Sequence, residues 1–146
     1  MQARQIWTFA TAARLKVGTS YFHTAHSAYE AFIQRYRRAD DLMVSAVRPD
    51  GQPVVGVASL YEQDFAMLAM AGLYSVRPSA ALLEDASRLR AAIEAFRHPA
   101  GGFRETDDHP FQSNAHMHLL EAALAWEDVG QESWATLTDE VAELAL

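Results

Sequence analysis

Hydrophobic residues recur every three or four positions along most of the chain, which is the spacing of an α-helix. Some of these stretches have one apolar face, and others are apolar around most of their circumference, as buried helices are. The stretches at 60–75 and 113–129 are of the second kind, and 2–16 is closer to it than to the first. The pattern predicts six helices, at 2–16, 20–38, 60–75, 79–97, 113–129 and 133–144.

The connections between these helices alternate in length. Short connections at 17–19, 76–78 and 129–132 join the helices in pairs, and longer ones at 39–60 and 98–112 join one pair to the next. An inner, buried helix followed by an outer, amphipathic one is the building unit of an α/α toroid. We therefore expect an all-α protein with one domain over 1–146.

One segment departs from the helical pattern. Residues 43–47 and 53–57 are rich in β-prone side chains and flank the turn-forming sequence Arg-Pro-Asp-Gly-Gln at 48–52. Two such runs around a Pro-Asp-Gly turn predict a small β-hairpin near 43–57.

Composition excludes several classes of protein. Half of the 146 residues are hydrophobic and no cysteine is present, so disordered chains, disulfide scaffolds and thiolate zinc sites are excluded. The net charge is −7, which disfavours nucleic acid as a partner. The one basic cluster, Arg35, Arg37 and Arg38, closes a predicted helix, where cations favour the helix dipole.

Neither a membrane span nor a signal peptide is predicted. The longest apolar stretch, 65–74, is about half of what a membrane span requires. The first nine residues, MQARQIWTF, contain no apolar segment of the signal-peptide kind. We therefore expect a soluble protein of the cytoplasm with no membrane partner.

The long connections enter the N-terminal ends of the inner helices, so we expect a functional site there. The positive ends of the helix dipoles favour oxygen-rich ligands and developing oxyanions. On the helix at 113–129, Asn114, His118 and Glu121 lie within about 60° of one another. Two interpretations stay open: these side chains bond to one another, or they face a ligand.

Two further side chains open inner helices at the same end. Arg4 stands in the first turn of its helix, where the dipole disfavours a cation, so either it binds a ligand or the terminus is solvated. Tyr61 is either a packing residue or a hydroxyl donor at the mouth of the site.

Histidines at 98, 109, 116 and 118 raise the question of a metal site. His116 and His118 are two residues apart, and such a pair points in divergent directions on a helix. We therefore expect no metal. His23 and His26 fall on a predicted outer helix and are assigned to its surface or its edge.

Three segments resemble the N-acylglucosamine 2-epimerase superfamily, which includes mannose isomerases, cellobiose 2-epimerases and sulfoquinovose isomerase. They are QARQIWTF at 2–9, LYEQDFA at 60–66, and GGFRE at 101–105 running into SNAHMHLLEA at 113–122. The second segment departs from the family's frequent Tyr-Asp-Gln-Ala-Phe, because Glu62 and Asp64 replace its Asp and Ala.

The resemblance implies an (α/α)6 barrel and proton transfer beside the carbonyl of a sugar, through an enediol and without a cofactor. It implies that His118 is the catalytic residue and that Arg4, Tyr61 and Asn114 bind the substrate. Three helix pairs make about half of such a toroid, and the family's other active-site histidines lie in the half that this chain lacks. The resemblance therefore implies a fragment with an incomplete site.

Two alternatives remain. The chain is a non-catalytic helical interaction module in one of them, with a homo-oligomer covering the open barrel edges. In the other it is a glycoside hydrolase, for which Glu105 and Glu121 are the candidate acids.

Overall fold

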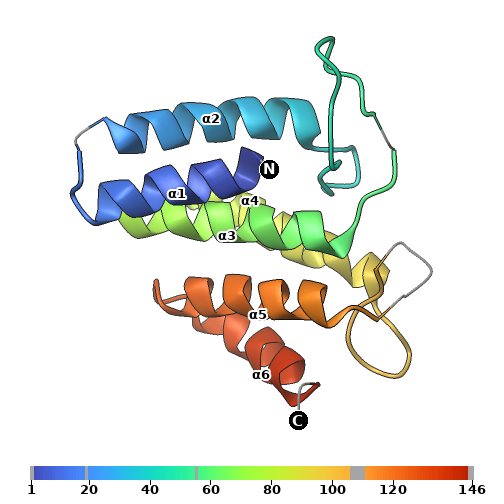
Figure 1. The fold of residues 1–146 in the computed structure, drawn as a ribbon. Helices are drawn as coiled ribbons and strands as arrows, with labels where there is room; N and C mark the ends of the chain where they lie inside the picture. The colour runs from blue at the N-terminus through green and yellow to red at the C-terminus, as the bar shows by residue number, and fades with distance from the viewer. Residues whose placement is uncertain (1, 19, 55, 106–110, 145–146) are drawn as a thin grey trace.

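The computed structural model describes residues 2–18, 20–54, 56–105 and 111–144, and six α-helices form within them (Figure 1). Two short 3-10 helices accompany them: η1 follows α4, and η2 precedes α6. The helical predictions are confirmed, with ends shifted by a few residues. The elements are α1 (Gln2–Arg14), α2 (Tyr21–Tyr36), α3 (Leu60–Val76), α4 (Ala80–Ala92), η1 (Ile93–Phe96), α5 (Ser113–Glu127), η2 (Glu132–Trp134) and α6 (Ala135–Glu143).

The helices form an inner and an outer set. α1, α3 and α5 lie side by side, with α3 in contact with both of the others (Figure 1). Each outer helix packs against the inner helix that precedes it: α2 against α1, α4 against α3 and α6 against α5. The inner helices therefore begin at a common end of the molecule.

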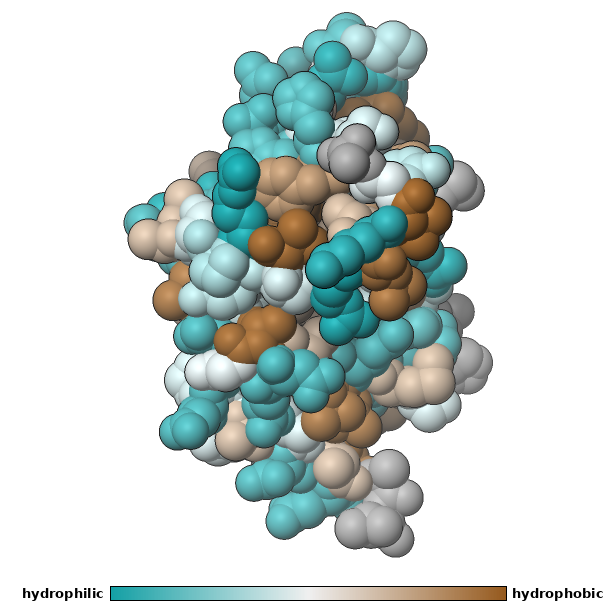
Figure 2. All heavy atoms as spheres, turned by 90° about the vertical axis from the view of Figure 1, so that its left-hand side faces the viewer, coloured by the Kyte–Doolittle hydropathy of each residue, from teal (hydrophilic) through white to brown (hydrophobic). Residues whose placement is uncertain are grey.

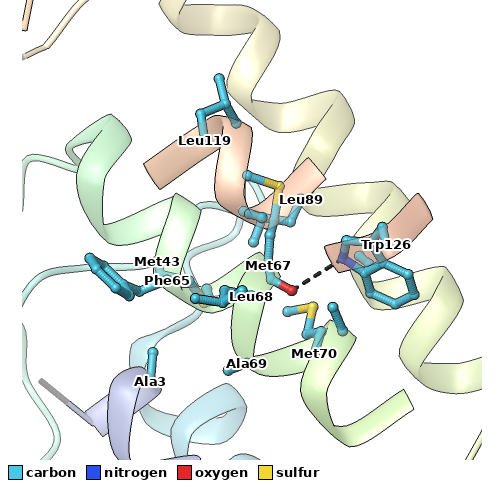
Figure 3. Packing of buried hydrophobic residues seen from close by; sticks show 14 of the residues in the cluster. Ala3, Met43, Phe65, Met67, Leu68, Ala69, Met70, Leu89, Leu119 and Trp126 are labelled. Carbon is cyan, nitrogen blue, oxygen red and sulfur yellow. Dashed lines mark hydrogen bonds between the residues drawn. The ribbon is translucent and has the colours of Figure 1, made fainter. Parts of the chain in front are cut away.

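Burial of α3 on all sides holds this arrangement together. Its first residue and residues 63–73 are buried, as its uniformly apolar pattern predicts. Trp126 of α5 donates its indole N–H to the carbonyl of Met67 at 3.1 Å (Figure 3). Its ring stacks on that of Trp134, with 5.4 Å between the centroids. On the other side, Gly72 makes room for Trp7, because a Cβ there would lie 2.6 Å from the indole ring.

The expectation that the helix at 113–129 is buried all round was wrong. α5 buries one face against α3 and α6, whereas Met117 and Leu124 remain 55% and 46% exposed. Apolar composition indicates burial only where neighbours exist on every side. In the described part of the chain, α5 has neighbours on one side.

The β-hairpin predicted near 43–57 was also wrong. Within the described residues of this segment, one isolated bridge joins Val47 to Pro53, and no strand forms. The chain does turn back here, since Gly51 N–H donates to the Arg48 carbonyl at 2.9 Å. Pro53 has no N–H to continue a ladder, and an isolated two-stranded ribbon is marginal in water.

A repeated turn leads from each outer helix toward the next inner one. We call residues 36–44 and 96–104 the return turns, and they have the same backbone hydrogen-bond pattern 60 residues apart. An isolated antiparallel bridge closes each of them. The bridged pairs are Arg37 with Met43 and Arg97 with Phe103.

The fourth residue of the following inner helix fixes each return turn. Gln63 accepts the Met43 N–H at 2.7 Å and donates back to the Met43 carbonyl at 3.0 Å. His116 accepts the Phe103 N–H on Nε2 at 3.1 Å. Gly102 has a φ of +67°, and a Cβ there would lie 2.9 Å from this nitrogen, so the second turn requires glycine.

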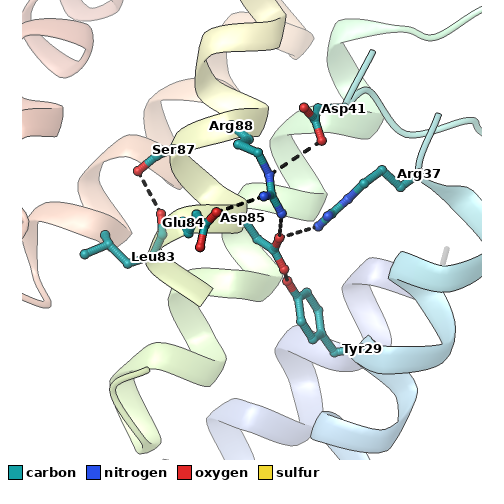
Figure 4. A network of polar contacts seen from close by, with 8 residues as sticks. All are labelled: Tyr29, Arg37, Asp41, Leu83, Glu84, Asp85, Ser87 and Arg88. Carbon is teal, nitrogen blue, oxygen red and sulfur yellow. Dashed lines mark hydrogen bonds and ion pairs between the residues drawn. The ribbon is translucent and has the colours of Figure 1, made fainter. Parts of the chain in front are cut away.

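A polar network joins the outer helices α2 and α4. Asp85 accepts a 2.5 Å hydrogen bond from the Tyr29 hydroxyl and pairs with Arg37 at 2.7 Å and Arg88 at 2.5 Å (Figure 4). Burial would raise the pKa of the Asp85 carboxyl, but the tyrosine and the two guanidinium groups outweigh it and lower that pKa. Burial and the bond to Asp85 raise the pKa of Tyr29 well above its usual value.

Replacing Tyr29 with Phe should destabilise the protein by about 1–2 kcal/mol, because a part-buried carboxylate loses a charge-assisted hydrogen bond. Urea unfolding followed by circular dichroism measures this difference. Tyr36→Phe is the matched control, since the Tyr36 hydroxyl on the same helix has no hydrogen-bond partner among the described residues. Equal stability of Y29F and the native chain would show that the network contributes nothing.

The opposite end of the molecule holds the C-terminal ends of the inner helices. There the hydrophobic residues are interspersed with hydrophilic ones rather than forming a single area (Figure 2). Across the described residues, no helix combines the length and apolar character that crossing a membrane requires.

Candidate functional site

Three of the four residues that the sequence assigns to the site meet at the N-terminal end of the inner helices. Arg4 of α1 donates a hydrogen bond to the Tyr61 hydroxyl at the start of α3. The Tyr61 ring lies edge-on to the imidazole of His118 on α5, with 5.4 Å between centroids. Residues far apart in the sequence thus form one cluster because their helices start at one end.

Phe65 lies at the centre of this cluster, and the sequence interpretation assigned it only to the core. The Arg4 guanidinium carbon lies 4.0 Å from the centroid of its ring, and the His118 ring lies 4.6 Å from it. The cation over an aromatic face is held electrostatically, which offsets the unfavourable helix dipole at Arg4. The spacing of Tyr61 and Phe65, four residues apart on one helix, was the available signal.

His118 is bound on its other side by Glu121. Its Nδ1 lies 3.0 Å from Oε2 of Glu121, one helical turn further along α5. The side chain of His118 is 19% exposed and that of Glu121 is 51% exposed. Of the two interpretations left open by the sequence, mutual bonding is confirmed for this pair.

Asn114 does not join the other three residues. It is exposed, and no hydrogen bond connects it to Arg4, Tyr61 or His118 in the described part of the chain. It lines an apolar groove of about 780 Å³ instead. The groove is bounded by the start of α5 and the end of α6, with Phe111, His116, Met117, Leu120, Val141 and Leu144 among its lining residues.

The remaining histidines are used differently. His116 donates from Nδ1 to the Gln112 carbonyl at 2.9 Å and accepts the Phe103 N–H, so both of its ring nitrogens are occupied. It points away from His118, as their spacing predicts. His98 packs against Phe111, and His109 lies outside the described residues. No group of three potential metal ligands occurs among the residues that the structure describes.

The N-terminus of α3, where we expected an oxyanion to bind, already holds a carboxylate. Glu105 accepts the backbone N–H groups of Leu60 at 3.2 Å and Tyr61 at 3.0 Å. A carboxylate here satisfies unpaired helix donors and favours the dipole. Both acids of the glycoside hydrolase alternative, Glu105 and Glu121, are thus bonded to groups of the protein itself.

Two further carboxyl groups, near the start of α3, have raised pKa values. Burial raises the pKa of Glu62, with Arg4 lowering it and Glu105 raising it further. Asp64 is completely buried, and neither of its oxygens has a hydrogen-bond partner among the described residues. Burial, assisted by the charge of Glu105, raises the pKa of Asp64 well above its ordinary value. The surroundings of the cluster are therefore acidic, with Arg4 as its cation.

A second hollow, of about 310 Å³, is lined by residues of all three inner helices. Trp7, Leu68 and Glu121 line it one turn beyond Arg4, Phe65 and His118 respectively. Arg14 and Asp128 line its far end. An aromatic ring beside a few charged groups is the kind of lining that binding sites for small molecules have.

Comparison with known proteins places the chain in a family. The family model for N-acylglucosamine 2-epimerase (GlcNAc 2-epimerase) matches residues 1–146. A mannose-6-phosphate isomerase from Rhizobium meliloti (strain 1021) is 36% identical over 154 residues, covering 100% of this chain and 40% of that protein.

Solved structures show the same fold. The cellobiose 2-epimerase from Spirochaeta thermophila DSM 6192 matches 97% of this chain with a TM-score of 0.85 at 23% identity. That from Bacillus thermoamylovorans B4167 matches 98% with a TM-score of 0.88 at 21% identity. Both are α/α barrels, of which the chain covers 41% and 42%. With its whole length matched by the family model, the chain belongs to the N-acylglucosamine 2-epimerase family.

Proposed function

We propose that the chain is part of a sugar epimerase or isomerase, in which His118 is the catalytic residue and Arg4 and Tyr61 bind the substrate. The observation that carries this proposal is the cluster of Arg4, Tyr61 and His118, which brings a cation, a hydroxyl and an imidazole from three inner helices together. Membership in the family supports it.

The chemistry follows from these groups. A neutral imidazole nitrogen of His118 removes the proton from C2 of the open-chain sugar. The electron pair of the broken C–H bond forms a C1–C2 double bond, and the carbonyl oxygen takes up the negative charge of an enediolate. Arg4 and Tyr61 are donors that stabilise this oxygen. Return of a proton to C2 from the opposite face gives the epimer. Return of a proton to C1, together with transfer of the O2 hydroxyl proton to O1, gives the isomer, so neither route needs a cofactor.

The proposed site is incomplete in this chain. Return of the proton from the opposite face requires a second acid on that side of the sugar, and the cluster supplies one imidazole. The described residues form three inner–outer helix pairs, which we interpret as about half of an (α/α)6 toroid forming a single domain. It spans about 40% of the length of the curated relative that it matches.

Proton exchange at C2 tests the proposal without requiring the second acid. The protein is incubated in D2O with D-mannose, D-glucose, N-acetylglucosamine and their phosphates, and loss of the C2 proton is followed by NMR. Exchange with at least one sugar, together with sugar-induced shifts at His118, supports the assignment. No exchange and no shift with any of them would contradict it.

Arg4→Gln should weaken binding of the active sugar about tenfold, because the substrate oxygen loses a charged donor. Titration of NMR shifts against sugar concentration measures the change in affinity. Arg35→Gln is the control, since Arg35 is exposed near the end of the outer helix α2. Equal losses in both variants would assign the effect to net charge rather than to the site.

The alternative of a non-catalytic interaction module has one observation in its favour, which is the apolar groove beside α6. Phe111, Met117 and Leu144 are each about half exposed there, and apolar groups gathered on a surface favour association. The occupant in this alternative is a second copy, because two chains of three helix pairs supply the helices of one ring. Light scattering tests it: a monomer at high concentration contradicts a homo-oligomer.

A further inference from the structure

The two histidines of α5 differ in how many ring nitrogens are free. His116 uses both, one to donate to Gln112 and one to accept from Phe103. His118 uses Nδ1 for Glu121, and its Nε2 has no hydrogen-bond partner among the described residues. A general base needs an unprotonated nitrogen with an accessible lone pair. On this helix only His118 has one to offer.

The partner of Nδ1 determines which nitrogen of His118 carries the proton. An ionised carboxylate accepts hydrogen bonds and cannot donate them, so the contact with Glu121 requires a proton on Nδ1. In the neutral ring Nε2 then has no proton, which is the form that a base requires. If Glu121 were absent, nothing in the described surroundings would fix this tautomer.

The orientation of the ring is fixed by the same set of contacts. Tyr61 lies edge-on to it at 5.4 Å and Phe65 lies at 4.6 Å, so aromatic side chains of α3 bound one side of the imidazole. Glu121 restrains rotation at Nδ1. Because the rings restrict where the imidazole lies and the carboxylate decides which nitrogen is protonated, the two effects are separable by mutation.

We propose that Glu121 is a positioning residue, which holds His118 in the Nδ1–H tautomer and so presents Nε2 as the base toward the sugar. The catalytic part of this inference rests on the proposed function, whereas the tautomer does not.

Two-bond proton–nitrogen NMR spectra of the histidine rings test the tautomer directly, at pH 8, where an ordinary imidazole with a pKa near 6.5 is neutral. The native chain should show the proton of His118 on Nδ1. In Glu121→Ala the proton should move to Nε2 in more than half of the molecules. Glu121→Gln should restore the native tautomer, because its amide oxygen still accepts a hydrogen bond.

Glu30→Ala is the matched control. Glu30 lies 3.7 Å from His26, four residues earlier on the outer helix α2, and its removal should leave the spectrum of His118 unchanged. A native His118 protonated on Nε2, or a Glu121→Ala spectrum identical to the native one, would overturn the inference. Circular dichroism verifies that each variant keeps its helices.

A kinetic measurement separates this inference from the proposed function. With the sugar that exchanges in the native chain, Glu121→Ala should lower the C2 exchange rate at least tenfold while the sugar affinity changes less than twofold. Exchange in Glu121→Gln should exceed that in Glu121→Ala. A native chain that exchanges no sugar would overturn the proposed function, yet the tautomer experiment would still decide the role of Glu121.

Discussion

His118→Ala should lower the rate of C2 proton exchange by about 10²–10⁴-fold, the usual contribution of a positioned general base. The imidazole lies where side chains of three inner helices meet, and its Nε2 has no hydrogen-bond partner in the part of the chain that the structure describes. Removing it leaves Arg4 and Tyr61, which polarise a carbonyl but do not accept a proton at neutral pH. The measurement is the exchange rate in D2O at saturating sugar.

We expect His118→Ala to lower the exchange rate rather than the sugar affinity, because the base acts on the proton that is transferred while other residues hold the substrate. His26→Ala is the control, since His26 lies on the outer helix α2 and touches Glu30 and Phe22 rather than the cluster. A rate in His118→Ala within twofold of the native rate would exclude His118 as the base. Urea unfolding of both variants verifies that the comparison is between folded chains.

Asp64→Ala should stabilise the protein at pH 8 by about 1–3 kcal/mol, although a substitution at a fully buried position usually destabilises. Both carboxyl oxygens of Asp64 are buried without partners among the described residues, so folding removes them from water without compensation. Alanine removes this cost and favours the helix more than aspartate does. It also restores the residue that the family frequently has in this segment.

The gain should depend on pH in a defined direction. Burial raises the pKa of Asp64 in the folded chain above its ordinary value of 3.8, which applies to the unfolded chain. At a pH between the unfolded-state pKa and the folded-state pKa, the folded chain keeps a proton that the unfolded chain releases. The native chain therefore loses stability as the pH rises through this interval. Below 3.8 both states are protonated, and the advantage of Asp64→Ala should be smallest there.

Urea unfolding at pH 4 and pH 8 measures this dependence as a difference between variant and native chain, in which the opposite contribution of Asp85 cancels. Asp139→Ala is the control, because Asp139 is exposed on α6. A variant less stable than the native chain at pH 8 would show that Asp64 has a stabilising partner. A gain that is equal at both pH values would show that the carboxyl is not protonated in the folded state.

The periodicity of apolar residues was sufficient to predict the helices and their pairing. The uniform pattern around Met67 and Leu73 identified α3 as the buried helix, and its central position follows from that. Arg4, Tyr61 and His118 could be assigned to one end of the molecule because each stands near the start of an inner helix. Their meeting was then a consequence of parallel inner helices rather than of any local motif.

Other features depend on partners that are distant in the sequence. Glu105 lies 45 residues beyond Leu60, and no local pattern indicates that its carboxylate occupies the start of α3. Asn114 and His118 lie on the same face of α5. Helical spacing alone does not show how far along that face the neighbouring described helices extend, so it could not show that Asn114 lies apart from the cluster. The segment at 43–57 has the residues of a hairpin, yet Pro53 has no N–H to extend a ladder, and one bridge joins described residues within the segment.

The two return turns share one pattern of backbone hydrogen bonds, but side chains of different kinds bind them to the following inner helix. The amide of Gln63 keeps its hydrogen-bonding capacity at every pH, whereas the imidazole of His116 accepts the Phe103 N–H only while Nε2 is unprotonated. Gln63 also forms two hydrogen bonds with Met43, whereas His116 forms one with Phe103. Local opening should therefore begin at the second turn, which would carry His118 away from Tyr61 before the rest of the chain unfolds.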